Sequence, residues 1–435
     1  MSSDSFTSPL AAELAPALLD RLTRYVRIDT QSARERASSP STPGQLELGR
    51  LLVAELKEAG LEDAELDSNG YVTATLPAGD GAYDEPVIGL IAHMDTSPDA
   101  PGRGVEPMVH RAYDGGTIEL PAGGTKLDPA RMPELAAARG HDIVTSSGDT
   151  LLGADDKAGV AIVMSAVAHL AAHPELSRPQ IRVGFTPDEE IGEGATLFDI
   201  ERFGARCAYT IDGSDLGELQ DESFSAIEAI VTVTGVDVHP GQASGKLVNA
   251  LRLIARIVAA LPDDLSPERT SGREGFIHPY ELSGSSARAE LRAILRDFDE
   301  HKLEDHLALL RRIAEDVVAA APGAELHLEV RRQYRNMRRY LEEEPGVVGA
   351  AETAMREEGI EPVRTPIRGG TDGSRLSEMG LPTPNIFTGG HEYHSVREWA
   401  SVQEMAASAA TVVRLAEVWS RSERAGEPGA ARAAG

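Results

Sequence analysis

The sequence predicts an α/β fold with a smaller α+β unit inserted into it. Short apolar runs typical of buried strands alternate with amphipathic helices up to about residue 223, and the same alternation resumes after residue 332. Between these points two longer alternating strands and two helices follow one another. We therefore expect a larger domain with a mixed, largely parallel sheet flanked by helices (1–223 and 333–420), an inserted domain (224–332) and a disordered tail (421–435).

The individual elements are expected from apolar spacing and from the residues that end each run. Leu14, Leu18 and Leu22 recur at helical spacing in the first helix, and Gly60 ends the second. Residues 67–70, Asp-Ser-Asn-Gly, predict a tight turn into a strand. The expected helices are 10–26, 45–60, 158–172, 247–261, 301–321, 347–358 and 402–419, and the expected strands are 71–76, 87–92, 181–186, 207–211, 226–234, 287–297 and 383–388.

Composition narrows the class of protein. The chain has 435 residues, of which 41% are hydrophobic, so it exceeds the size that one core usually serves. Its formal net charge of −28 argues against a nucleic acid or an anionic membrane as a partner. It has no basic-then-apolar signal at its start, no apolar run long enough to span a bilayer, and a single cysteine, Cys207. These features predict a cytoplasmic enzyme.

Histidines and carboxylates follow several of the predicted strands. Each of them singly is more often a core or surface residue, so their shared placement is what favours a site. In an open α/β sheet the carboxyl ends of the strands meet at one crevice, where ligands bind. The residues concerned are His93 and Asp95 after strand 87–92, Glu189 and Glu190 after strand 181–186, Asp212 after strand 207–211, and His394 after strand 383–388.

Asp155 and Asp156 form an acidic pair at the start of an apolar helix. Taken alone, such a pair is better explained by capping of the helix dipole. So many carboxylates in one crevice repel one another and have raised pKa values unless cations are bound. Imidazoles and carboxylates without cysteine suit zinc, cobalt or manganese better than calcium or magnesium. The residues thus predict a metal centre.

Six further segments stand out together and in order. They are 93–98 (HMDTSP), 151–159 (LLGADDKAG), 186–190 (TPDEE), 238–241 (VHPG), 295–299 (LRDFD) and 367–373 (IRGGTDG). Together they resemble the co-catalytic dizinc peptidase family that includes tripeptide aminopeptidases, carboxypeptidase G and the aminoacylases. The resemblance spans nearly the whole chain apart from its two ends. It implies a zinc-peptidase catalytic domain with an inserted lid and dimerisation domain.

The resemblance also implies a role for each matching residue of the metal centre. Asp95 would orient His93, and Glu189 would be the general base when a dizinc-bound hydroxide attacks the first peptide carbonyl of a tripeptide. The peptide bond after the bridging aspartate would be cis. Two Zn²⁺ ions per subunit, with Co²⁺ or Mn²⁺ as possible substitutes, would be bound by His93 and Asp212 on one side, Glu190 and His394 on the other, and Asp155 between them.

Substrate contacts are implied in the same way. His239 matches the family histidine that reaches the active site of a partner subunit, where it would stabilise the oxyanion, so a homodimer is expected. Arg296 and Arg368 match substrate-side arginines, whose planar guanidinium suits a carboxylate. Asn249 and Asn336 are further candidates. Without the resemblance, His239 is better explained as a turn residue, and Arg368 has the alternative of bonding local carbonyls.

Three functions remain open at this point. The first is a tripeptide aminopeptidase, the second an N-acyl amino acid deacylase or dipeptidase with the same metal chemistry, and the third an inactive binding protein on this scaffold. The run 368–373 favours the first, and the presence of every expected ligand argues against the third. Arg397 stands where a second histidine is common in the family. This makes His394, and not His391, the expected ligand, and it could alter peptide preference.

Overall fold

The computed structural model describes residues 5–79 and 86–422. The chain divides into two compact units. The first unit comprises Met1–Asp221, Arg339–Thr365 and Thr371–Gly435, and the second comprises Glu222–Arg338 and Pro366–Gly370. From residue 423 on, the tail that the sequence leaves without structure lies outside the described residues.

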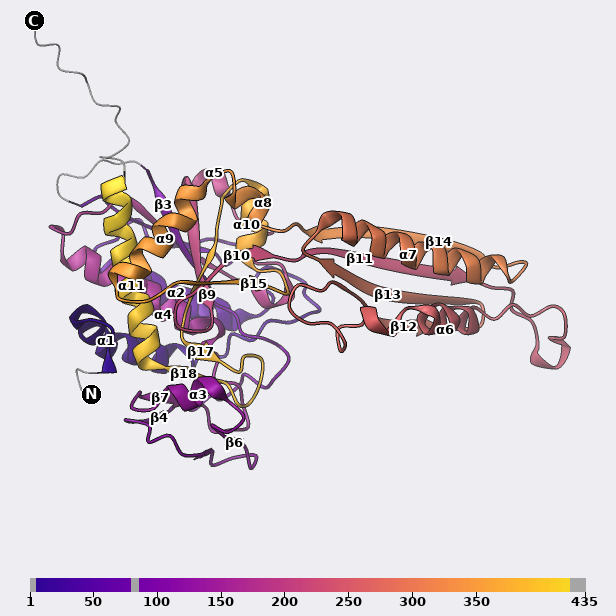
Figure 1. Ribbon diagram of the computed structural model, residues 1–435, viewed down its shortest axis with the longest axis horizontal. Helices are drawn as coiled ribbons and strands as arrows, with labels where there is room; N and C mark the ends of the chain where they lie inside the picture. Colours follow the sequence, from indigo (N-terminus) through magenta and orange to yellow (C-terminus); the bar gives the residue numbers. More distant parts are fainter. Residues whose placement is uncertain (1–4, 80–85, 423–435) are drawn as a thin grey trace, which may run out of the picture. The chain divides into compact units, whose positions relative to one another are not determined.

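A mixed eight-stranded sheet forms the centre of the first unit (Figure 1). Its strand order is β1-β2-β8-β3-β9-β16-β10-β15, and the central strands β8, β3, β9 and β16 run parallel to one another. Strand β3 is buried along its whole length, as expected for a parallel strand covered on both faces. This confirms the predicted α/β class. The strands are β1 Glu65–Leu66, β2 Val72–Leu76, β3 Ile88–His93, β8 Ile181–Thr186, β9 Cys207–Gly213, β10 Glu218–Ser223, β15 Val363–Ile367 and β16 Asn385–Phe387.

Helices cover this sheet, and α4 lies innermost among them. It packs against β3, β9, α1 and α11, and its nearly uniform apolar sequence explains why almost every side chain is buried. It begins at Ala154, four residues before the expected start. The backbone angles of Asp155 and Asp156 in this first turn are not helical, so the regular helix starts after them. The helices are α1 Pro9–Tyr25, α2 Pro43–Glu58, α3 Pro133–Ala137, α4 Ala154–Ala172, α5 Ile200–Phe203, α8 Arg338–Leu341, α9 Pro345–Glu357, α10 Asp372–Met379 and α11 Val402–Ser422.

A second, four-stranded sheet of the first unit is absent from the sequence-based prediction. Its order is β17-β18-β7-β4, and helix α3 lies beside it (Figure 1). The strands have only two or three residues, too few to show an alternating pattern. They and the neighbouring hairpin are β4 Met108–His110, β7 Ile143–Thr145, β17 Gly390–His391 and β18 Trp399–Ser401, with β5 Ile118–Glu119 paired to β6 Lys126–Leu127.

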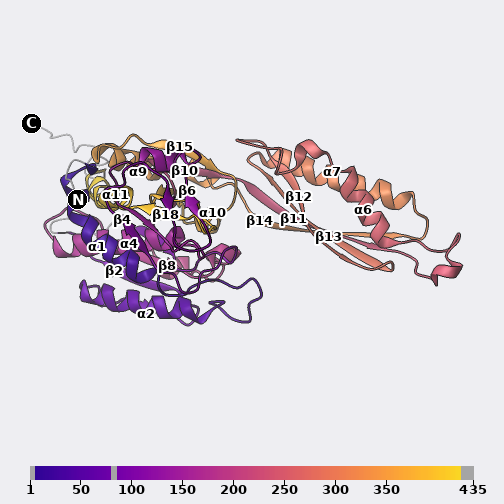
Figure 2. The ribbon, with the colours of Figure 1, turned by 90° about the horizontal axis from the view of Figure 1, so that it is seen from below.

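The second unit is an antiparallel sheet with two helices on one face, as Figure 2 shows. Inward-facing residues of β13 alternate with outward ones, so one face packs on both helices. The predicted strands β11 and β13 are present, whereas β12 and β14 were not predicted because their side chains are largely exposed. In the order β12-β13-β11-β14 the strands are Phe276–Gly284, Arg288–Asp297, Ser225–Thr234 and Glu325–Tyr334, and the helices are α6 Ala250–Ala260 and α7 Glu300–Ala319.

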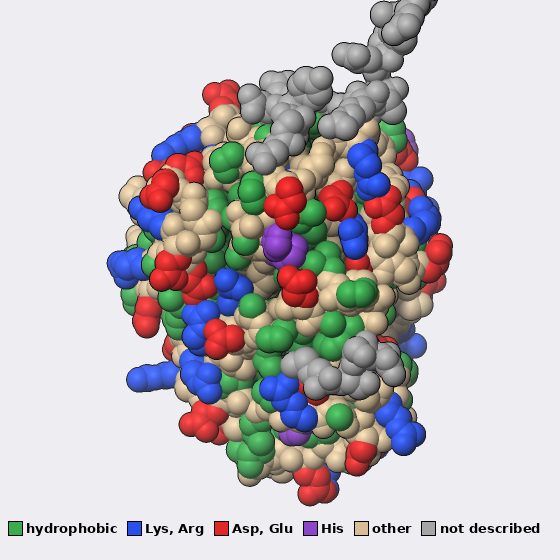
Figure 3. All heavy atoms as spheres, turned by 90° about the vertical axis from the view of Figure 1, so that its left-hand side faces the viewer, with side chains coloured by type: hydrophobic (Ala, Val, Ile, Leu, Met, Phe, Trp, Pro, Cys, Tyr) green, Lys and Arg blue, Asp and Glu red, His purple; other side chains and the backbone are tan. Residues whose placement is uncertain are grey.

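Within residues 5–79 and 86–422 no helix is long and apolar enough to cross a bilayer. On the face drawn in Figure 3, acidic and basic side chains are interspersed with small apolar areas.

Candidate metal centre

The five expected ligands lie together in the first unit, at the carboxyl ends of the central strands. His93 ends β3 and Asp212 lies near the end of β9. Glu190 lies on the short 3₁₀ turn after β8, His394 on the loop between β17 and β18, and Asp155 at the start of α4. The crevice that the sequence predicts is therefore formed, and two strands, a turn, a loop and a helix that are distant in sequence supply its side chains.

Asp155 lies between two groups of ligand atoms. Its Oδ1 is 3.0 Å from Nε2 of His93, which is also 3.6 Å from Oδ1 of Asp212. Its Oδ2 is 3.2 Å from Nε2 of His394, which is 2.9 Å from Oε2 of Glu190. One carboxylate therefore offers an oxygen to each of two imidazole–carboxylate pairs, which is the arrangement a bridging ligand requires.

The donor set fits a pair of divalent cations. Oε1 of Glu190 is buried without a hydrogen-bond partner among the described residues. Burial, with the charge of Asp155 adding to it, raises the pKa of Glu190 to about 8, and burial raises the pKa of Asp212 as well. Cations at this place would satisfy the unpaired oxygen and relieve the repulsion among the carboxylates. Imidazole nitrogens and carboxylate oxygens without sulfur suit zinc and similar ions.

Asp95 holds both sides of the centre. Its Oδ1 lies 3.3 Å from Nδ1 of His93, and its backbone oxygen lies 3.1 Å from the same nitrogen. Its two carboxylate oxygens also accept the backbone N–H groups of Glu189 at 2.9 Å and Glu190 at 3.1 Å. Asp95 thus holds both the imidazole of His93 and the 3₁₀ turn that carries Glu189 and Glu190. The sequence led us to expect only the contact with His93.

Glu398 is a residue of the centre that the sequence did not indicate. Its side chain is fully buried, and its Oε2 accepts the N–H groups of Leu152 and Gly153 at 2.8 Å each. Its Oε1 accepts the N–H of Asp155 at 3.0 Å. One carboxylate from the His394 loop therefore holds the turn that carries Asp155. All of its partners are backbone groups, which have no signature in a sequence.

Two further buried aspartates brace the turn after β8. Asp188, in a left-handed conformation with φ 58°, accepts the N–H of Ser41 at 2.7 Å and a side-chain N–H of Gln45 at 2.8 Å. Asp372 accepts the hydroxyl of Thr186 at 2.6 Å, and burial raises its pKa to about 6. Both lie inside the segments that carry the family resemblance, 186–190 and 367–373. The sequence alone does not show whether an aspartate there would bind a metal or accept hydrogen bonds from neighbouring segments.

His391, the alternative ligand considered from sequence, is occupied elsewhere. Its ring stacks on Trp399 with centroids 4.1 Å apart, and its nitrogens lie 3.0 Å from Glu404 and 3.2 Å from Asp215. Burial opposes the charged form, but the two carboxylates outweigh it and raise the pKa of His391 to about 9. His391 is therefore a buried, charged partner of two acids outside the metal centre.

This ion pairing predicts a stability that depends on pH. The raised pKa stabilises the folded state fully below the unfolded pKa of about 6.5 and ceases to do so as pH rises through about 9. We expect His391→Gln to lower the free energy of unfolding by up to about 3 kcal/mol at pH 6 and by much less at pH 9.5. Urea unfolding of both proteins across this range measures the difference, and a difference independent of pH would contradict the assignment.

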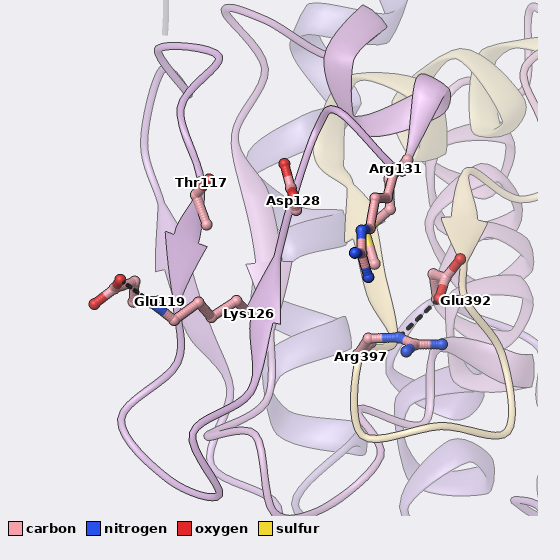
Figure 4. Close-up of a pocket in the computed structure, with 8 residues that line it drawn as sticks. Thr117, Glu119, Lys126, Asp128, Arg131, Glu392 and Arg397 are labelled. Carbon is pink, nitrogen blue, oxygen red and sulfur yellow. Dashed lines mark hydrogen bonds and ion pairs between the residues drawn. The ribbon is translucent and has the colours of Figure 1, made fainter.

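A pocket of about 500 Å³ lies beside the loop that carries His394 (Figure 4). Nε of Arg397 donates to Oε2 of Glu392 at 3.0 Å, and both side chains line the pocket. Arg397 is therefore paired within its own loop. The other lining residues come from the β5–β6 hairpin and the segment after it: Thr117, Glu119, Lys126, Asp128, Arg131 and Met132.

The two arginines expected to bind substrate belong to the second unit and have local partners there. Arg368 donates from Nη1 to the backbone oxygens of Gly272 at 2.7 Å and Glu274 at 2.9 Å. Arg296 donates from Nη1 to the backbone oxygen of Arg368 at 3.2 Å, while its buried Nε has no hydrogen-bond partner among the described residues. The local role considered for Arg368 is thus present, and substrate binding by either arginine stays a prediction.

The other second-unit candidates also make local contacts. Asn249 caps α6 by accepting the N–H of Arg252, and Asn336 accepts the N–H of Ser223. Nδ1 of His239, an exposed residue, accepts the N–H of Gly241 at 3.1 Å. The turn role considered for His239 is therefore present as well. Its part in a reaction stays a prediction, as do those of the two asparagines.

Solved structures share this fold. Aminopeptidase PepT from Bacillus cereus superposes with a TM-score of 0.71 at 24% identity, over 93% of this chain and 98% of that one. A tripeptidase from Staphylococcus aureus gives 0.73 at 20% identity, over 94% and 99%. The YXEP protein of Bacillus subtilis, described as a dinuclear metal-binding peptidase from the M20 family, gives 0.62 at 15% identity, over 94% and 98%.

Sequence comparison gives a closer relation. Peptidase T of Vibrio parahaemolyticus is 47% identical over 92% of this chain and 98% of its own length, and Peptidase T of Bacillus subtilis is 45% identical over the same shares. Residues 151–418 match the Peptidase family M20/M25/M40. These findings confirm the resemblance carried by the six segments. The chain belongs to the M20/M25/M40 family of peptidases.

Proposed function

We propose that the protein is a dizinc aminopeptidase that releases the N-terminal residue from tripeptides. The observation that carries this proposal is the carboxylate of Asp155 placed between two imidazole–carboxylate pairs, with Glu189 on the adjoining turn. Full-length relatives named Peptidase T support the tripeptide substrate. We assign the zinc sites to His93 and Asp212, and to Glu190 and His394.

Glu189 is the proposed general base. Its backbone N–H is fixed by Asp95, and burial raises the pKa of its side chain well above the ordinary value. A buried carboxyl of raised pKa accepts a proton from the attacking water and later delivers it to the leaving amine. Two cations bound by these residues would lower the pKa of a water and would stabilise negative charge on the carbonyl oxygen. Glu189 thus moves the proton at both stages.

The second unit provides the proposed substrate contacts. We assign the terminal carboxylate of the peptide to Arg296 and Arg368, with Asn249 and Asn336 as further contacts. His239 is exposed, which leaves it accessible to a partner subunit in a homodimer. A cytoplasmic location fits an enzyme that degrades small peptides.

One tripeptide in three forms tests this function. We expect the free peptide to release its N-terminal residue, the N-acetylated and C-amidated forms to react at least about 100-fold more slowly because they lack a charged end, and a chelator to abolish the reaction until zinc is restored. Release of acetate from the acetylated form would instead indicate a deacylase. No turnover of any form with any metal would indicate a binding protein.

Glu398→Gln tests how the turn of Asp155 is held. Because Gln has one acceptor oxygen, one of the three backbone N–H groups loses its partner, and Asp155 is displaced. We expect activity or zinc affinity to fall about 10- to 100-fold, as for other residues that orient ligands. Glu392→Gln, an exposed change on the same loop, serves as the control. Equal zinc affinity and activity in both variants would show that Glu398 does not position the centre.

A further inference from the structure

A second cluster of metal-ligating groups lies at the other end of α4 from Asp155. It consists of His169 and His173 at the end of α4 and Glu13 on α1. One ligand atom from each residue lies within 4.8 Å of the others. We propose that these three residues bind one divalent transition-metal ion, separate from the catalytic pair.

The helix explains why the two imidazoles converge. Residues four apart lie one above the other on the same helix face, which is also the spacing of the histidines in helical zinc sites. The ring centroids of His169 and His173 are 4.5 Å apart. The backbone N–H of His173 still bonds the backbone oxygens of His169 and Leu170, so the helical turn continues to this residue and keeps the two side chains on the same face.

The third ligand comes from the neighbouring helix. Helix α1 packs against α4, and Oε1 of Glu13 lies 3.6 Å from Nδ1 of His169. Oε1 of Glu175 lies 2.9 Å from Nδ1 of His173 and would either complete the site or orient that ring. Two imidazoles and one or two carboxylates form a set that suits Zn²⁺, Co²⁺, Ni²⁺ or Cu²⁺ better than Ca²⁺ or Mg²⁺.

The surroundings of His169 also favour a bound cation. The groups that face it are acidic: Glu13, Glu175 and Glu417 all favour positive charge at this place. A bound ion would supply that charge and would link α1 to α4.

The test counts metal ions on the enzyme already loaded at its catalytic centre. Enzyme dialysed against enough Zn²⁺ to give full peptidase activity is titrated with Ni²⁺ and, separately, with Zn²⁺ in a calorimeter. We expect one additional equivalent per chain, and at least a tenfold weaker additional site in His169→Gln and in His173→Gln. His327→Gln, which removes a single exposed histidine, should retain it.

Two further readouts separate this site from the catalytic one. Peptidase activity at full zinc loading should be the same in the His173→Gln variant as in the unchanged protein, because the residue is outside the catalytic centre. Excess Ni²⁺ should raise the melting temperature of the unchanged protein and not that of the variant. An additional equivalent that survives both histidine substitutions, or no additional equivalent at all, would overturn the proposal.

Discussion

Glu189→Gln is expected to lower kcat at least about 1000-fold while the protein keeps its bound zinc and its fold. The amide has nearly the same shape but cannot accept a proton from water. The contacts that hold the turn, from the backbone N–H groups to Asp95, do not involve the substituted side chain. Steady-state kinetics together with metal analysis of the purified variant measure both quantities.

Glu190→Gln is the matched comparison, because it makes the same chemical change at the next position. Its carboxylate lies 2.9 Å from Nε2 of His394, so we expect this variant to lose zinc from one of the two sites as well as activity. The two substitutions then differ in zinc content. If Glu189→Gln also lost zinc, Glu189 would be a ligand and the proton would need another acceptor.

The centre was recognisable from sequence because its ligands follow elements with a strong pattern. His93 and Asp212 come at the ends of buried apolar strands, whose carboxyl ends must meet in a parallel arrangement. The assignment of each ligand to one ion came from the family resemblance. Asp155 lies between the two imidazole–carboxylate pairs, and the assignment of each residue to an ion stays a prediction.

What the sequence did not indicate falls into two physical classes. The short strands around His391 carry no periodicity, and they form because other segments offer them backbone partners. Glu398 accepts backbone N–H groups that only the folded chain brings to it. The spacing of apolar residues indicates which face of a helix or strand is buried. It does not indicate which distant segments of the chain come into contact, and these contacts depend on that alone.

Asp155→Asn is expected to lose both bound metal ions and at least about 100-fold of the activity, because the neutral amide is a poor bridge between two cations. In the metal-free protein, burial opposes the charged form of Asp155, but hydrogen bonds with His394 and His93 outweigh it and hold the pKa of Asp155 well below its usual range. Its charge therefore stabilises the folded state, and we expect the melting temperature, measured with chelator, to fall as well. Metal analysis, kinetics and thermal melts measure these effects.

Asp156→Asn should keep its zinc, and comparison with Asp155→Asn decides which aspartate is the ligand. Asp156 accepts the N–H groups of His93 and Gly159, both at 3.1 Å. An asparagine has one acceptor oxygen, so one buried N–H loses its partner, at a cost of about 1–3 kcal/mol in stability, while zinc stays bound. His93, Asp156 and Asp212 also lie close enough to bind an ion together. Loss of zinc from Asp156→Asn but not from Asp155→Asn would assign the bridging position to Asp156. A lowered melting temperature of Asp156→Asn would not do so, because the broken backbone contacts alone lower it.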